Sequence, residues 1–191
     1  DGKISGLTSG DTIGLSDTDG ALFRFTELAI PDNATISSAY LRVYAGSDES
    51  GASNLKISIE NTGNAGPLAG SHEAFVGNVP WAISSSEPWV RSNAYTSPDI
   101  SGLVRAALSQ GWDEGNSMLI KLEKTSGSNR TVYAHDYNSQ PQAAQLIVNF
   151  VDDGSLGASR VRDEFITQVD SLSADGYTPI QDTLYEAYQY L

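Results

Sequence analysis

Short segments of alternating apolar and polar residues, separated by turn residues, constrain this chain more than any other feature of its sequence. Leu55, Ile57 and Ile59, for example, alternate with Lys56 and Ser58. A period of two places alternate side chains on opposite faces of a strand, one facing a core and the other facing water. Comparable β-forming segments occupy residues 22–28, 39–44, 118–122, 132–137 and 145–150. Many short strands with Gly, Asn, Asp and Pro between them predict a mainly β fold, an antiparallel jelly-roll β-sandwich.

One segment within this region follows a helical period. Apolar residues recur at helical spacing and form a single stripe: Ile100, Leu103, Val104, Ala107 and Leu108. Ser97 or Asp99 is suited to cap the start of this helix, and Gly111 is suited to end it. The sequence therefore predicts one short helix among the strands. Residues 61–86, which are rich in small residues, predict a long loop with at most short strands.

The composition changes after Phe150. Residues 152–157 are typical of a linker, and residues 158–191 predict two amphipathic helices. Thr178, Pro179 and Gln181 form a capping box at the start of the second helix. Two such helices without a sheet leave their apolar faces uncovered. We therefore expect a sandwich domain over residues 1–151 and part of a second domain over residues 158–191.

The charge of the chain limits its partners. The net charge is -13, from 24 acidic and 11 basic residues. A negative field repels phosphate backbones, so nucleic acid and anionic membranes are poor partners. No apolar run approaches the length that a membrane-spanning helix needs, so membrane insertion is not expected.

The residues that usually carry catalysis form no recognisable pattern. The chain has no cysteine, which excludes disulfides, cysteine nucleophiles and thiolate metal sites. His72 and His135 lie far apart without the spacing of a zinc site, and no Gly-x-Ser-x-Gly nucleophile motif is present. Nothing selects a pair of carboxylates for glycoside hydrolysis. The sequence therefore predicts a protein that is not an enzyme.

Aromatic residues offer the candidate ligand-binding site. Trp81, Trp89, Tyr95 and Trp112 could stack on sugars, and the alternative is that they belong to the core or anchor loops. Trp81 and Trp89 lie in Pro- and Ser-rich surroundings, so we expect these two to be the better exposed. The predicted ligand-binding residues are Trp81, Trp89 and Tyr95.

A metal site in the first domain is a second candidate. Asp11, Asp17 and Asp19 lie in a Gly-rich stretch where Ca²⁺ could bind. Their spacing does not fit an EF-hand, which needs further ligands and a distal Glu. We therefore expect ordinary turn residues here and require no cofactor, with Ca²⁺ or Mg²⁺ as the alternative left open.

One stretch of the first domain resembles a known family. Leu22-Phe23-Arg24-Phe25 leads through Ile30-Pro31 to Ala34-Thr35-Ile36-Ser37-Ser38-Ala39-Tyr40-Leu41. This stretch resembles the signature of DNRLRE-type jelly rolls, which are related to carbohydrate-binding modules. Asn33 stands where the family usually has Gly. Asn tolerates the same turn conformations as Gly, so this difference is compatible with the resemblance. The resemblance implies a jelly roll over nearly all of residues 1–151.

A second stretch resembles part of another domain. Gly176-Tyr177-Thr178-Pro179-Ile180 and Leu184-Tyr185-Glu186-Ala187 are similar to a segment of von Willebrand factor type A domains. The two resemblances together are typical of PilY-type adhesins associated with type IV pili, in which a jelly roll is inserted into a von Willebrand A domain. Residues 158–191 would then be the resumption of an incomplete α/β domain whose Asp-x-Ser-x-Ser metal loop precedes residue 1. The resemblance makes Thr178 a metal ligand, whereas the residues alone favour a helix cap.

Together these resemblances imply an extracellular adhesion or binding module at a bacterial cell surface or pilus tip. It would attach to surfaces or host cells, and its partners would be pilus or cell-surface components. A glycan-specific carbohydrate-binding module and a ligand-free structural spacer are the alternatives.

Overall fold

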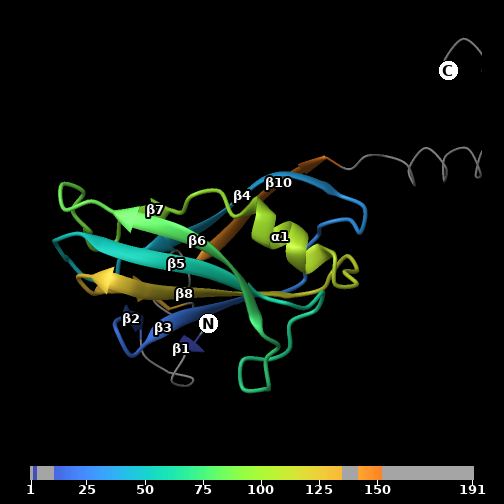
Figure 1. Cartoon of the computed structure of the whole chain (residues 1–191), viewed down its shortest axis with the longest axis horizontal. Helices are drawn as coiled ribbons and strands as arrows, with labels where there is room; N and C mark the ends of the chain where they lie inside the picture. Colours follow the sequence, from blue (N-terminus) through green and yellow to red (C-terminus); the bar gives the residue numbers. More distant parts are fainter. Residues whose placement is uncertain (1, 4–10, 135–141, 152–191) are drawn as a thin grey trace, which may run out of the picture. The chain divides into compact units, whose positions relative to one another are not determined.

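The computed structural model describes residues 2–3, 11–134 and 142–151, which form a mainly β structure (Figure 1). The strands pair antiparallel in three sheets. The five-stranded sheet has the order β1 (Gly2–Lys3), β3 (Gly20–Phe25), β8 (Met118–Gly127), β5 (Ser53–Glu60) and β6 (Phe75–Ile83). The three-stranded sheet has the order β10 (Gln145–Val151), β4 (Thr35–Tyr44) and β7 (Ala94–Thr96). The two-stranded sheet pairs β2 (Thr12–Leu15) with β9 (Arg130–Tyr133).

Apolar side chains from all three sheets meet in one core. Phe23 and Ile57 come from the five-stranded sheet, Leu41 from the three-stranded sheet and Ile13 from the two-stranded sheet. Each is at most 2% exposed. The period-two alternation therefore identified the buried face of β3, β4 and β5, whereas β2 was not predicted. For the described residues, the expectation of a mainly β, sandwich-like fold with one helix is confirmed.

The single helix of the described residues, α1, spans Ser101–Leu108. Leu103, Val104 and Ala107 of the predicted stripe are buried in the core. Of the two candidate caps, Asp99 contacts the helix, because its Oδ1 accepts a hydrogen bond from the Ser101 amide at 2.9 Å. The Ser97 hydroxyl accepts instead from the backbone of β4, outside the helix.

The long loop predicted over residues 61–86 is wrong for its second half. Residues 75–83 form β6, which pairs with β5 along the edge of the five-stranded sheet. Gly77, at a φ of 78°, and Pro80 interrupt the alternation that would have revealed this strand. Such residues are tolerated on an edge strand because one side of its backbone needs no partner. Residues 61–74 remain a loop.

Contacts divide the chain between Asp152 and Asp153. The predicted linker, the predicted two-helix segment at residues 158–191 and Thr178 all lie outside the described residues. Within the described ranges, no helix has the length and apolar character needed to cross a membrane.

Candidate functional site

Three of the four candidate aromatic residues pack against one another. The ring of Trp89 stacks on Tyr95 with centroids 4.0 Å apart and meets Trp81 edge to face at 6.4 Å. Trp112 lies elsewhere, where its indole Nε1 donates to the carbonyl of Ile30 at 2.9 Å. Trp81, Trp89 and Tyr95 thus form one aromatic cluster.

The expectation that Trp81 and Trp89 are exposed is wrong. Trp81 is 6% exposed and Trp89 is 0% exposed. Trp81 lies on β6 opposite Leu55 of β5, on the face of the sheet that meets the core. A sugar stacks only on an accessible ring face, and neither indole offers one in this structure. Their assignment as ligand-binding residues therefore stays a prediction, and their observed contacts are those of core residues.

Trp89 holds a long exposed loop to the sandwich. This loop, residues 84–93, joins β6 to β7 and is called the anchored loop below. Trp89 is its one buried residue; the others are exposed. The backbone of Trp89 exchanges two hydrogen bonds with Glu49, at 2.8 and 3.0 Å, and its indole Nε1 donates to the carbonyl of Thr131 at 3.0 Å. Trp89 therefore attaches the loop through the burial of its side chain and through three hydrogen bonds.

Tyr95 fastens the middle of the anchored loop through its hydroxyl. The hydroxyl donates to the carbonyl of Pro88 at 2.7 Å and accepts from the amide of Val90 at 2.7 Å. The Tyr95 side chain therefore bonds the backbone on both sides of Trp89 while its ring stacks on the Trp89 indole. Tyr95 therefore contributes both an apolar ring, which stacks, and a polar hydroxyl, which forms hydrogen bonds.

Polar contacts fix the end of the anchored loop. The Arg91 amide donates to Asp48 Oδ1 at 2.8 Å, and the Arg91 Nε donates to the hydroxyl of Tyr133 at 2.9 Å. Val90, at 37% exposed, remains accessible between these attachments. The anchored loop is therefore a rigidly attached surface that combines an apolar side chain with charged neighbours, an arrangement suited to binding.

Two charged residues near the aromatic cluster, Glu49 and Arg130, form hydrogen bonds with neighbouring segments of the chain. Glu49 accepts from the amide and the hydroxyl of Thr131, both at 2.8 Å. The buried guanidinium of Arg130 donates to the carbonyls of Ser50, Gly51 and Asn129 and lies 5.8 Å from the Trp89 ring centroid. These bonds stabilise the loops around the cluster.

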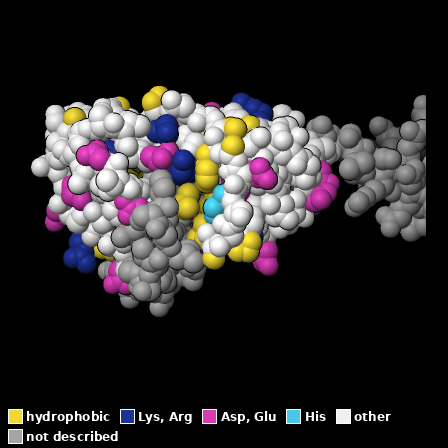
Figure 2. All heavy atoms as spheres, turned by 60° about the horizontal axis from the view of Figure 1, so that its bottom comes forward, with side chains coloured by type: hydrophobic (Ala, Val, Ile, Leu, Met, Phe, Trp, Pro, Cys, Tyr) yellow, Lys and Arg dark blue, Asp and Glu magenta, His cyan; other side chains and the backbone are white. Residues whose placement is uncertain are grey.

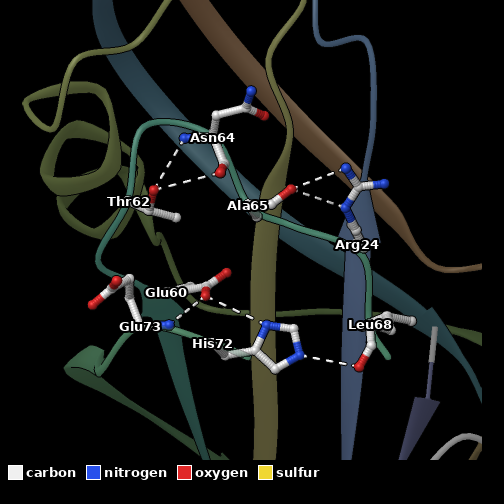
Figure 3. Close-up of polar contacts among 8 residues, drawn as sticks. All are labelled: Arg24, Glu60, Thr62, Asn64, Ala65, Leu68, His72 and Glu73. Carbon is white, nitrogen blue, oxygen red and sulfur yellow. Dashed lines mark hydrogen bonds and ion pairs between the residues drawn. The ribbon is translucent and has the colours of Figure 1, made fainter. Parts of the chain in front are cut away.

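A second cluster, which the sequence analysis missed, lies beneath the loop of residues 61–74 (Figure 3). Glu60, at the end of β5, is 2% exposed. Its Oε1 accepts from the Glu73 amide at 2.6 Å and lies 3.4 Å from Nδ1 of His72. The other ring nitrogen of His72 lies 3.2 Å from the carbonyl of Leu68. One buried carboxylate thus fastens the second half of this loop.

The first half of the same loop is fastened by Arg24. Its Nε and Nη2 bond the carbonyl of Ala65 at 3.1 and 2.9 Å (Figure 3). Ala65 in turn packs with Leu22 and Leu119 in a small apolar cluster on the outer face of the five-stranded sheet. Figure 2 shows hydrophobic side chains exposed beside a histidine, with basic and acidic side chains nearby. No sequence motif indicated these contacts of Arg24 and Ala65, because the residues that form them are far apart along the chain.

Two lysines on the same outer face form ion pairs with the carboxylate of Glu123 and lower its pKa. Glu123 Oε2 lies 3.1 Å from Lys56 Nζ and 3.2 Å from Lys121 Nζ. Partial burial alone would raise the pKa of Glu123, but the bonds and charges of the two lysines outweigh it and lower the pKa. Glu123 is therefore held ionised by two cations, as a structural ion pair requires.

Two of the three aspartates considered for a metal site, Asp17 and Asp19, have other contacts. Asp17 pairs with Nζ of Lys124 at 2.8 Å, and Asp19 accepts from the amide of Gly20 at 3.1 Å. Across residues 11–134 and 142–151, no three His, Asp or Glu side chains are placed together to hold a metal ion.

Comparison of the chain with protein-family models and with curated proteins gives no match.

Proposed function

We propose that residues 1–151 form a jelly-roll adhesion or binding module, without enzymatic activity, of an extracellular bacterial protein at the cell surface or type IV pilus tip. In this proposal, residues 158–191 belong to an incomplete von Willebrand A domain, with Thr178 as a helix cap or metal ligand. The module attaches to surfaces or host cells, and pilus or cell-surface components are its partners.

The anchored loop is the observation that carries this proposal. It presents exposed residues on both sides of Trp89, which is fully buried. Loops positioned by a rigid scaffold are a common site of binding in proteins. The many attachments of this loop suit a surface that must keep its shape while it bears contact with a partner.

The DNRLRE-like stretch supports the fold part of the proposal. Its apolar residues Phe23, Ile36 and Leu41 are buried in the core, and the stretch passes from β3 in the five-stranded sheet to β4 in the three-stranded sheet. These residues therefore constrain how the two sheets face each other. They carry no information about the ligand, because none of them reaches the surface.

An attachment assay with the 191-residue chain tests the proposal. Beads coated with the chain should attach under flow to host-cell monolayers, polystyrene or glass more strongly than uncoated beads. Val90→Asp should weaken attachment, because it places a charge at the exposed apolar residue of the anchored loop. Ser71→Asp is the matched control, since it adds the same charge in the exposed loop at the other end of β6.

The rival functions give different results. Binding to defined sugars on a glycan array would favour the carbohydrate-binding module. Beads that attach to none of the surfaces, with a silent array and a stably folded chain, would contradict adhesion and favour the spacer. Equal attachment by the Val90→Asp and Ser71→Asp variants would remove the anchored loop from the proposal.

A further inference from the structure

The ring of His72 lies between two oxygen atoms, one facing each of its nitrogens (Figure 3). Nδ1 is 3.4 Å from Oε1 of Glu60, and Nε2 is 3.2 Å from the carbonyl oxygen of Leu68. A carbonyl oxygen only accepts hydrogen bonds, and so does an ionised carboxylate. A neutral imidazole carries one N–H and can donate to one of these oxygens but not to both. The contacts on the two sides of the ring are therefore satisfied together only when one further proton is bound.

The surroundings of Glu60 lead to the same requirement. Its side chain is 2% exposed, and within the described ranges His72 is the one basic side chain at ion-pair distance from its carboxylate. The Glu73 amide donates to Oε1, whereas Oε2 is buried without a hydrogen-bond partner among the described residues. A buried carboxylate is costly unless it is neutralised or paired with an opposite charge. A proton shared by Glu60 and Nδ1 of His72 meets this need, and it belongs to the pair as a unit.

The strands beside β5 contribute one further charged group near the His72 ring. On β6, the ring of Phe75 meets His72 edge to face, with centroids 6.5 Å apart. Lys121 of β8 lies beyond it, with Nζ 4.7 Å from the centroid of Phe75. The charge of Lys121 is paired with Glu123 at 3.2 Å. This lysine is therefore balanced by its own partner.

Two more charged side chains belong to this region. The guanidinium of Arg24, on β3, bonds the carbonyl of Ala65. The carboxylate of Glu73, on the loop itself, points away from the His72 ring (Figure 3). Of the charged groups in the described part of the chain, Glu60 is thus the one paired with His72.

The shared proton couples the closure of this loop to pH. When the second half of the loop is detached, both side chains lie in water, where histidine titrates near pH 6.5 and glutamate near pH 4.3. Above about pH 6.5 the detached pair therefore holds no proton, whereas the attached pair holds one. The state that binds more protons is favoured at low pH. The attached state consequently loses stability as the pH rises.

We propose that Glu60 and His72 form a proton-dependent latch, which holds the second half of the loop of residues 61–74 in mildly acidic surroundings and releases it as the pH rises. The first half stays attached, because Arg24 keeps its charge and its bonds to a backbone carbonyl over this range. The second half includes Leu68, which packs against the small apolar cluster on the outer face of the five-stranded sheet. Its release therefore uncovers apolar surface. This inference does not depend on what the anchored loop binds.

Hydrogen exchange at the Glu73 amide of the 191-residue chain, measured between about pH 6 and about pH 8, tests the latch. The protection factor, which corrects for the intrinsic pH dependence of exchange, should fall by up to about tenfold per pH unit, the limit for one linked proton. His72→Gln removes the titrating ring, so its protection factor should not change with pH. Glu60→Gln keeps an acceptor for the Glu73 amide but removes the carboxylate, and it should abolish the pH dependence as well.

The Ala65 amide, which donates to the carbonyl of Ser117 in the first half of the loop, is the internal control and should keep a constant protection factor. Circular dichroism checks that each variant retains its sheets. A wild-type protection factor at Glu73 that is constant or rises with pH overturns the proposal. The same fall in the His72→Gln variant also overturns it, and so does a parallel fall at Ala65, because neither would come from this pair.

Discussion

The rings of Trp89 and Tyr95 lie nearly parallel, with an interplanar angle of 18° and centroids 4.0 Å apart. Trp89 belongs to the anchored loop and Tyr95 to β7, so this stack joins an exposed loop to the sheet. The same pair also connects the loop to the core, because Trp89 is completely buried.

Trp89→Ala should therefore reduce the free energy of unfolding by about 3–5 kcal/mol, the usual cost of truncating a buried aromatic residue. Trp89→Phe should cost less, because a ring remains to stack on Tyr95 while the bond to the Thr131 carbonyl is lost. Urea unfolding followed by circular dichroism measures both values. A Trp89→Ala variant as stable as the wild type would show that Trp89 does not hold the loop.

Tyr95→Phe removes only the hydroxyl that bonds Pro88 and Val90. We expect a loss of about 1 kcal/mol in stability and faster hydrogen exchange at the Val90 amide. Tyr44→Phe, a hydroxyl deletion on β4, serves as the comparison. Unchanged exchange at Val90 in the Tyr95→Phe variant would contradict the role of this hydroxyl.

Asp99 makes the stability of the chain depend on pH. Hydrogen bonds from the amides of Ala39 and Ser101 lower the pKa of Asp99 in the folded state. A lowered folded pKa adds stability above the unfolded pKa of about 3.9, and this stability is lost as the pH falls through the folded value. The difference in Tm between the wild type and Asp99→Asn should therefore be largest near neutral pH and shrink in acid. A difference that is constant with pH would contradict it.

Glu60 should control the second half of the loop at residues 61–74 and leave its first half unaffected. Glu60→Ala removes the acceptor of the Glu73 amide, so hydrogen exchange at Glu73 should become faster. The Ala65 amide, which donates to the carbonyl of Ser117, should keep its protection and is the internal control. Glu60→Gln retains an oxygen acceptor and should restore most of the protection at Glu73. Equal loss at both amides would show that the loop opens as one unit.

Gly127, at the end of β8, should not tolerate a side chain. Its φ is 85°, and a Cβ there would lie 2.4 Å from the carbonyl oxygen of Ala52. Gly127→Ala should therefore cost more than the roughly 1 kcal/mol expected from backbone conformation alone. Gly14→Ala, where a Cβ meets nothing within 4 Å, is the control and should have little effect on Tm. Similar Tm values for the two variants would contradict this.

The sequence revealed the strands whose alternation is regular. Leu55, Ile57 and Ile59 are buried as their spacing predicted, and the stripe of α1 faces the core. β6 was missed because Gly77 and Pro80 break its pattern, which is a consequence of its place at a sheet edge. Local periodicity reports the face of a strand, but it does not report which strands form the edges.

Only part of the candidate site could be predicted from the sequence. The sequence selected Trp81, Trp89 and Tyr95, and the structure places them together, but the burial of Trp89 depends on Glu49 and Thr131, which are distant along the chain. Glu60 and His72 gave no signal at all, because a lone acid and a lone histidine match no motif. Long-range contacts of this kind need the fold before they can be seen.

The attachments of the anchored loop have a thermodynamic consequence for any ligand. The loop is ordered when the chain folds, so binding incurs little additional loss of backbone entropy. Its shape also exists before the ligand arrives, and association is therefore not slowed by a conformational change. Affinity at this surface should then depend on the contacts themselves, and a heat-capacity change on binding should reflect buried area without a contribution from loop folding.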